Sequence, residues 1–176
     1  MKLIIAAAFM ASAALGLTRC ADTPEVPSSS TAEGEGIQIR INNGEWITLP
    51  GSAQRLSQNQ YTLHTGSCKD SHVSISWKGI EPTGYYRWNF ISSGPANGNL
   101  FQSRLNGNTD YHSFYLHGKI AADSPGSVVI KEFGEVGGYV SGTFTLDKAS
   151  QVNTVAPDVS ARTVKIEGRF KVKRTA

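Results

Sequence analysis

Cysteine is scarce in this chain of 176 residues: Cys20 and Cys68 are the only two, too few for a disulfide-stabilised scaffold. Charged residues make up 18% of the sequence, and no segment beyond residue 36 carries the apolar stripe of an amphipathic helix. This composition excludes coiled-coil and collagen-like structure. The sequence also lacks a Gly-x-Ser-x-Gly elbow, a phosphate-binding loop, an HExxH motif and the paired carboxylates of glycoside hydrolases. We therefore expect neither catalysis nor a cofactor.

The first 19 residues have the features of an export signal. Lys2 supplies a positive charge, and residues 3–17 form an uncharged run of apolar and small side chains. This run matches a signal-peptide core and is shorter than the roughly 20 residues of a membrane-spanning helix. Removal of Lys2 and Arg19 reduces the 17 basic residues to 15 against 14 acidic ones, a net charge of +1. We therefore expect no nucleic-acid partner.

The segment Leu17-Thr18-Arg19-Cys20 resembles a bacterial lipobox, in which the cysteine thiol is diacylated and becomes the new N-terminus. Arg19 departs from the pattern, because that position normally holds Gly, Ala or Ser. The resemblance implies a membrane attachment through lipid at Cys20, and a cell-envelope location as an outer-membrane lipoprotein facing either the periplasm or the outside. Cleavage after Ala13 or Gly16 would instead give a soluble secreted protein, and no cleavage would leave an N-terminal anchor.

The chain is expected to have three parts. Residues 1–19 are the signal peptide. Residues 20–36 are rich in Pro, Ser, Gly and acidic side chains and offer little to bury, so we expect a flexible tether. Residues 37–176 form the folded domain, which the tether would hold away from the membrane.

Beyond residue 36, apolar and polar side chains alternate with a period of two, which is typical of half-buried strands. Asn43-Gly44 predicts a type I′ hairpin between the first two strands. Strands are expected at residues 37–41, 46–49, 61–64, 73–77, 85–91, 100–105, 111–120, 127–133, 139–146 and 162–173. The sequence thus predicts an all-β domain, a single antiparallel β-sandwich or partly open barrel of about 9–10 strands.

The last expected strand sends apolar and charged side chains to opposite faces. The inward set is Val164, Ile166, Phe170 and Val172. The outward set is Lys165, Glu167, Arg169, Lys171 and Lys173. We interpret the cationic face as protection of a sheet edge against pairing with another chain. Gly142 and Gly168 are expected at bends or close approaches in neighbouring strands, with Phe144 and Phe170 buried in one core.

Three segments resemble a family of small uncharacterised lipoproteins from Bacteroidetes-type bacteria. Residues 39–46 (IRINNGEW) are similar to the family's INGK-x-W opening, and residues 138–146 (GYVSGTFTL) to its GYISGTFSF strand. Residues 164–172 (VKIEGRFKV) resemble its closing V-x-I-T-N-G-R-F-D-V segment. The resemblance implies a membrane-anchored β-sandwich, and it brings no known activity and no catalytic residues.

The histidines and Cys68 suggest one site that we weigh against a plain hairpin. His64 and His72 flank Cys68 at equal distances. In a hairpin centred on Cys68, the two imidazoles could pair across the strands beside the thiol, as in a metal site or a Cys–His nucleophile. We favour a polar hairpin with a loop cysteine, because zinc needs three or four ligands. His112 and His117 are expected on opposite faces of one strand.

Large rings concentrate in the central third of the chain, and alternation divides them between two faces. The face opposite the core would carry Tyr85, Arg87, Tyr111, Tyr115 and His117, which are our candidate ligand-binding residues. Such a surface is typical of recognition of a glycan or a protein, whereas rings covered on both faces would be core. We expect the loops at residues 97–108 and 147–161 to contact a partner.

The sequence therefore predicts an exported, lipid-anchored, non-catalytic binding module. Two alternatives stay open. A lipocalin-like carrier of a small apolar ligand would need a closed barrel with an apolar cavity. A soluble secreted protein of the inhibitor type would follow if Cys20 is not lipidated.

Overall fold

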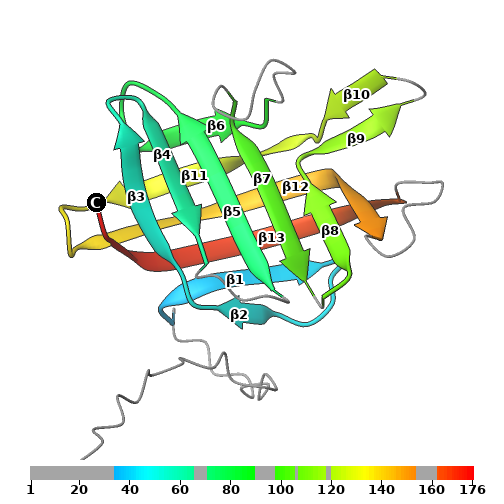
Figure 1. The fold of residues 1–176 in the computed structure, drawn as a ribbon, viewed down its shortest axis with the longest axis horizontal. Coiled ribbons are helices and arrows are strands. Elements are labelled where there is room, and N and C mark those ends of the chain that lie inside the picture. The colour runs from blue at the N-terminus through cyan, green and yellow to red at the C-terminus, as the bar shows by residue number, and fades with distance from the viewer. Residues whose placement is uncertain (1–33, 66–70, 90–97, 106, 118–119, 154–161) are drawn as a thin grey trace, which may run out of the picture.

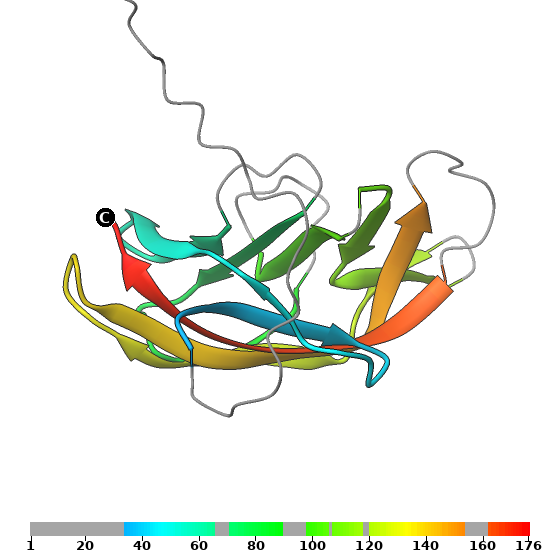
Figure 2. The same cartoon turned by 90° about the horizontal axis from the view of Figure 1, so that it is seen from below.

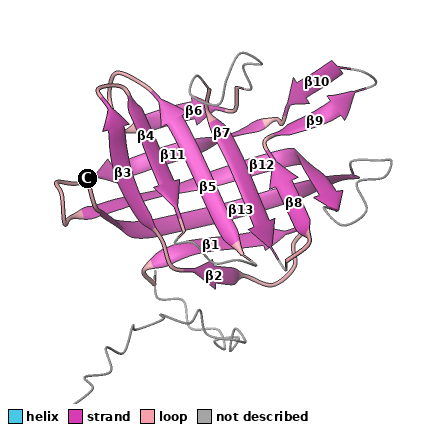
Figure 3. Cartoon of the chain, viewed as in Figure 1, coloured by secondary structure: helices cyan, strands magenta, loops and turns pink. Residues whose placement is uncertain are grey.

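The computed structural model describes residues 34–65, 71–89, 98–105, 107–117, 120–153 and 162–176. In these ranges the regular structure consists of strands joined by loops and turns (Figure 3), which confirms the predicted all-β class. Across the same ranges we find no helix that is long and apolar enough to span a membrane. The predicted signal peptide, Cys20, most of the tether and Cys68 lie outside the described residues.

The strands form two layers that run crosswise to each other (Figure 1). We call the first the β13 layer; in spatial order it contains β2 (Ile47–Leu49), β1 (Gly36–Ile41), β13 (Arg162–Arg174), β12 (Tyr139–Asn153), β11 (Gly126–Phe133) and β6 (Gly84–Arg87). The second, the β5 layer, contains β3 (Ser52–Ser57), β4 (Gln60–His64), β5 (His72–Lys78), β7 (Leu100–Leu105) and β8 (Thr109–His112). A separate hairpin joins β9 (Phe114–His117) to β10 (Ile120–Asp123).

Two strands pass from one layer to the other and close the sandwich at two corners. β12 pairs with β13 along most of its length, and a register shift between Leu146 and Ala149 turns its end toward β8 (Figure 2). At the other corner, Lys173 and Arg174 of β13 pair with β3 in parallel. Corners made by bent or bulged strands are characteristic of crossed sandwiches. This arrangement agrees with the predicted sandwich or partly open barrel, with one parallel pairing where we expected antiparallel strands only.

The described residues form 13 strands rather than the 9–10 predicted. β3 escaped prediction because Ala53 is its one buried apolar residue, so its alternation is weak. Residues 111–120 divide into parts of β8, β9 and β10, with a break at Ser113, whose N–H donates to the carbonyl of Phe101. Residues 147–153, which we expected in a partner-binding loop, continue β12.

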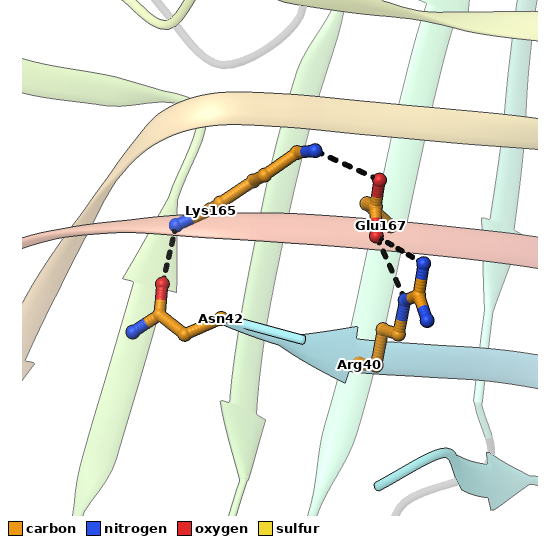
Figure 4. Close-up of polar contacts among 4 residues, drawn as sticks. All are labelled: Arg40, Asn42, Lys165 and Glu167. Carbon is orange, nitrogen blue, oxygen red and sulfur yellow. Dashed lines mark hydrogen bonds and ion pairs between the residues drawn. The ribbon is translucent and has the colours of Figure 1, made fainter. Parts of the chain in front are cut away.

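The hairpin between β1 and β2 is confirmed, with its turn one residue earlier than predicted. Asn42 and Asn43 have φ angles of 49° and 60°, and the N–H of Gly44 donates to the carbonyl of Ile41 at 2.9 Å. Two successive residues with positive φ are the mark of a type I′ turn, and Asn tolerates this conformation. The Asn42 Oδ1 also accepts a hydrogen bond from the backbone N–H of Lys165 at 2.9 Å, which ties the turn to β13 (Figure 4).

The core lies between the layers and draws side chains from both. Its largest fully buried members are Trp77, Tyr61, Phe101, Phe144, Ile37, Ile39, Leu63, Ile75, Leu105, Leu146, Ile166 and Val73. Tyr61 stacks on Trp77 with ring centroids 5.5 Å apart, and Phe133 meets both rings edge-on. The inward positions predicted for the last strand, and the burial of Phe144 and Phe170, are confirmed.

The edge-protection interpretation of the last strand is wrong. β13 lies inside its layer, with β12 on one side and β1 and β3 on the other. The edges of the β13 layer are instead β2 and β6. The cationic outer side of β13 therefore stands in the middle of a sheet surface, where a different explanation is needed.

Candidate ligand-binding site

Tyr85 and Arg87, two of the predicted site residues, lie on the edge strand β6 and face solvent. Tyr85 is 60% exposed and stands opposite Val129 of β11. Hydrogen bonds with the side chains of Ser127 and Arg87 lower the pKa of Tyr85. These two side chains are therefore accessible, and they remain a candidate contact surface.

Tyr111 does not share that surface. It lies on β8 and is 7% exposed, and burial raises its pKa. Tyr111 is the most buried residue of β8, and its neighbours Asp110 and His112 are only partly buried. Tyr115 and His117 lie on β9, which pairs with β10, and their side chains are outside what the structure describes. Within the described strands, β6, β8 and β9 are not paired with one another, so the five predicted residues do not form one continuous sheet surface.

The structure corrects the predicted pairing of His64 with His72. β4 and β5 form the expected hairpin, but His64 pairs with Ser74 rather than with His72, so the two imidazoles are not directly opposite. Cys68 lies outside the described residues. His112 and His117 belong to separate strands, β8 and β9, and not to one strand as predicted. Among the described side chains, no group of three or more His, Cys, Asp or Glu is placed to hold a metal ion.

A shallow pocket lies on the outer face of the β13 layer. It has a volume of about 210 Å³ and crosses four strands. Its lining residues are Gly34, Gly36, Gln38, Lys131, Glu132, Ser141, Gly142, Thr143, Arg169, Phe170 and Lys171. Strand alternation explains why Gln38, Ser141, Thr143, Arg169 and Lys171 gather here, because their neighbours Ile37, Ile39, Val140, Phe170 and Val172 point into the core. The middle of the sheet thus presents polar side chains around a concave surface.

Three cations and one carboxylate line this pocket: Lys131, Arg169 and Lys171 against Glu132, a local excess of two positive charges. The Arg169 Nε donates a hydrogen bond to the Gln38 Oε1. The Arg169 guanidinium also lies 5.2 Å from the ring centre of Trp46, which is 39% exposed. These contacts hold Arg169 in place at the pocket without neutralising its charge.

Lys171 is oriented in a similar way by an aromatic ring. Its Nζ lies 5.0 Å from the ring centre of Tyr139, and the Nζ of Lys173 lies 3.8 Å from the same ring. The Tyr139 hydroxyl donates a hydrogen bond to the carboxylate of Glu35, at the start of the described chain. Cation–π contacts of this kind stabilise a charge by about 0.5–1 kcal/mol at exposed sites and leave it positive.

Further along β13, two cations share one carboxylate (Figure 4). Arg40 contacts Glu167 at 2.7 Å, and the Nζ of Lys165 contacts the same carboxylate at 3.0 Å. Hydrogen bonds from Lys165 and Arg40 lower the pKa of Glu167. One carboxylate thus serves two cations at this end of the face, whereas Lys131, Arg169 and Lys171 form no ion pair with a carboxylate in the described part of the chain.

This site was missed at the sequence level, although one signal for it was visible. The alternating cations of residues 165–173 stood out, but they were attributed to edge protection. The contributions of Gln38, Lys131 and Tyr139 come from other strands and depend on pairings that a single sequence does not reveal. Comparison of the chain with protein-family models, with curated proteins and with solved structures found no match.

Proposed function

We propose that this protein is an exported, lipid-anchored protein of the cell envelope that acts as a non-catalytic binding module. Its binding surface is the outer face of the β13 layer around the pocket. The observation that carries the proposal is the group of three cations, Lys131, Arg169 and Lys171, which line one concavity without ion-pair partners among the described residues. Cations held in place around a concavity attract ligands of opposite charge and favour those whose charges match the arrangement.

The anchor is supported by the sequence and is compatible with the position of the site. The apolar run of residues 3–17, the Cys20 motif and the polar segment that follows are the parts that a lipoprotein requires. The tether reaches the domain at β1, and Gly34 and Gly36 line the pocket. The segment that would connect to the membrane therefore enters beside the proposed binding surface.

The carrier alternative is not favoured by the interior of the sandwich. A carrier needs an apolar cavity of roughly 300 Å³ or more between its sheets. Tyr61, Trp77 and Phe133 instead pack against one another in that space. The secreted alternative differs from our proposal only in whether Cys20 is lipidated, so the mass of the mature chain separates the two.

The anchor is tested by the intact mass of the mature chain, extracted from membranes of a bacterium that expresses the full sequence. We expect a chain that begins at Cys20 and carries acyl groups. The Cys20→Ser variant, as the matched control, should carry no acyl groups. A mature chain that begins at Ala14 or Leu17, or retains residue 1, would contradict the lipoprotein proposal.

Binding is tested with soluble Cys20→Ser protein on an array of neutral and acidic saccharides. We expect at least one ligand whose signal is lost in the Lys131→Gln, Lys171→Gln double variant. Tyr85→Ala, on the β6 edge, is the matched control for the other accessible surface. A signal that depends on Tyr85 and not on the lysines would move the site to β6, and the absence of any ligand would contradict the binding function.

A further inference from the structure

We infer that the pocket on the β13 layer recognises a negatively charged group, a carboxylate or a sulfate, carried by a saccharide. This inference rests on the proposed function and specifies its ligand. It starts from the charge of the pocket, where Lys131, Arg169 and Lys171 exceed Glu132 by two positive charges. The mature chain as a whole would carry a net charge of only +1 after removal of the predicted signal, so the excess is local.

The contrast between the two ends of this face strengthens the argument. Arg40 of β1 and Lys165 of β13 share the carboxylate of Glu167, so each has an ion-pair partner. Arg169 and Lys171 lie on the same outer side of β13, but there the structure supplies an amide and two rings instead of a carboxylate. Their positive charge is therefore available to a ligand anion, and Lys131 adds a third cation from β11.

The aromatic residues of this face argue against a neutral sugar as the ligand. Neutral saccharides are commonly held by an open aromatic ring on which the sugar packs. The ring of Trp46 already contacts the guanidinium groups of Arg40 and Arg169, with distances to its centre of 4.8 and 5.2 Å. The ring of Tyr139 contacts the ammonium groups of Lys171 and Lys173. These rings orient cations, so recognition here depends on charge.

The remaining lining suits a ligand that also carries hydroxyl groups. The side chains of Gln38, Ser141 and Thr143 both donate and accept hydrogen bonds, as sugar hydroxyls require. Glu132 accepts a hydrogen bond from the Ser141 hydroxyl, with 3.3 Å between the two oxygens, and an ionised carboxylate also accepts hydrogen bonds from sugar hydroxyls. The volume of about 210 Å³ is below the roughly 300–1,000 Å³ of drug-sized sites, so the pocket would hold one unit of a longer chain.

The test uses the mature chain with Cys20→Ser and two matched pairs of polymers. Polygalacturonate is compared with its fully methyl-esterified form, and dextran sulfate with dextran, by isothermal titration calorimetry. We expect at least one acidic polymer to bind at least tenfold more tightly than its neutral counterpart, and the affinity to fall as salt is added. The Lys131→Gln, Lys171→Gln double variant should lose at least tenfold of this affinity.

A control variant with the same net charge separates the pocket from bulk attraction. Lys78→Gln, Lys148→Gln also removes two lysines, both from exposed positions on other parts of the sheet, and should bind as the parent does. Equal loss in both double variants would overturn the inference, as would equal affinity for acidic and neutral polymers. If neither acidic polymer binds, the inference is overturned as well. If a neutral saccharide on the array described above then binds in a way that depends on Lys131 and Lys171, the proposed binding function still holds.

Membrane binding is the other outcome that would overturn the inference. Vesicles of phosphatidylcholine with phosphatidylglycerol are offered to the same protein beside vesicles of phosphatidylcholine alone. We expect no lysine-dependent binding to either. Lysine-dependent binding to the anionic vesicles, without binding to the acidic polymers, would assign this face to the membrane surface and not to a saccharide.

Discussion

Phe144 of β12 lies directly opposite Gly168 of β13, and its ring fills the space that a side chain at position 168 would need. A Cβ built on Gly168 would lie 2.0 Å from the Cζ of Phe144. The relationship is repeated two residues away, where Phe170 of β13 faces Gly142 of β12. Two glycines inside paired strands, which usually weaken a sheet, here allow two rings to pack into the core from adjacent strands.

The first prediction concerns this pair. Gly168→Ala should lower the free energy of unfolding by about 1–3 kcal/mol, because the added methyl group forces the buried Phe144 ring to move. Urea denaturation followed by tryptophan fluorescence measures the change. Phe144→Leu in the same background should recover part of the loss, since the smaller side chain frees the space. An unchanged unfolding free energy for Gly168→Ala would contradict the close packing.

Gly142 provides the contrast to that rescue. A Cβ there would meet the carbonyl oxygen of Val129 at 2.1 Å as well as the ring of Phe170 at 2.6 Å. The backbone of β11 cannot move aside as a side chain can. We therefore expect Gly142→Ala to cost more than Gly168→Ala and Phe170→Leu to give no recovery.

The sequence was sufficient to predict the class of the fold because each half-buried strand carries its own alternation. Residues 73–77 and 164–172 identified their inward faces correctly without any knowledge of neighbours. The sequence was insufficient to predict the order in which the strands pair, because β13 pairs with β1, β12 and β3, which lie far from it or from one another along the chain. The cationic face was therefore attributed to an edge, and the pocket, which needs four strands, could not be predicted at all.

The second prediction concerns the turn at Asn42. Asn42→Ala should lower the free energy of unfolding by about 2 kcal/mol, because it places Ala at a φ of 49° and removes the hydrogen bond to the N–H of Lys165. Asn42→Gly keeps the backbone conformation and loses only the hydrogen bond, so a loss of about 1 kcal/mol is expected. Thermal and urea unfolding measure both. Equal losses for the two variants would show that the positive φ contributes nothing.

The third prediction is a dependence of stability on pH that arises at His112. Burial lowers the pKa of His112, opposed in part by the charge of Asp110, and its Nδ1 is buried without a hydrogen-bond partner among the described residues. Between this lowered pKa and the ordinary value of about 6.5, the unfolded chain binds more protons than the folded one. The stabilising contribution is therefore complete above about pH 6.5 and is lost as the pH falls through the lowered pKa.

The substitution His112→Gln should flatten the pH dependence in that window, as measured by urea unfolding from pH 8 to pH 5. Asp110→Asn is a second variant, which tests the dependence of stability on pH in a more acidic range. The hydrogen bond from Arg104 lowers the pKa of Asp110, so its contribution is present above about pH 3.9 and lost below it. A His112→Gln protein with the parent's slope between pH 8 and 5 would contradict the assignment.

The fourth prediction tests whether Trp46 fixes the cations of the pocket. Trp46→Leu removes the ring that contacts both Arg40 and Arg169, and it should lower the free energy of unfolding by about 1–2 kcal/mol, the sum expected of two exposed cation–π contacts. Trp46→Phe keeps an aromatic face and should lose less. Without the ring, Arg40 is still held by its ion pair with Glu167, so Arg169 is the side chain that loses most of its orientation. The affinity of Trp46→Leu for an acidic polymer should therefore decrease at least threefold, whereas a loss of stability with unchanged affinity would show that the ring supports the fold and not the site.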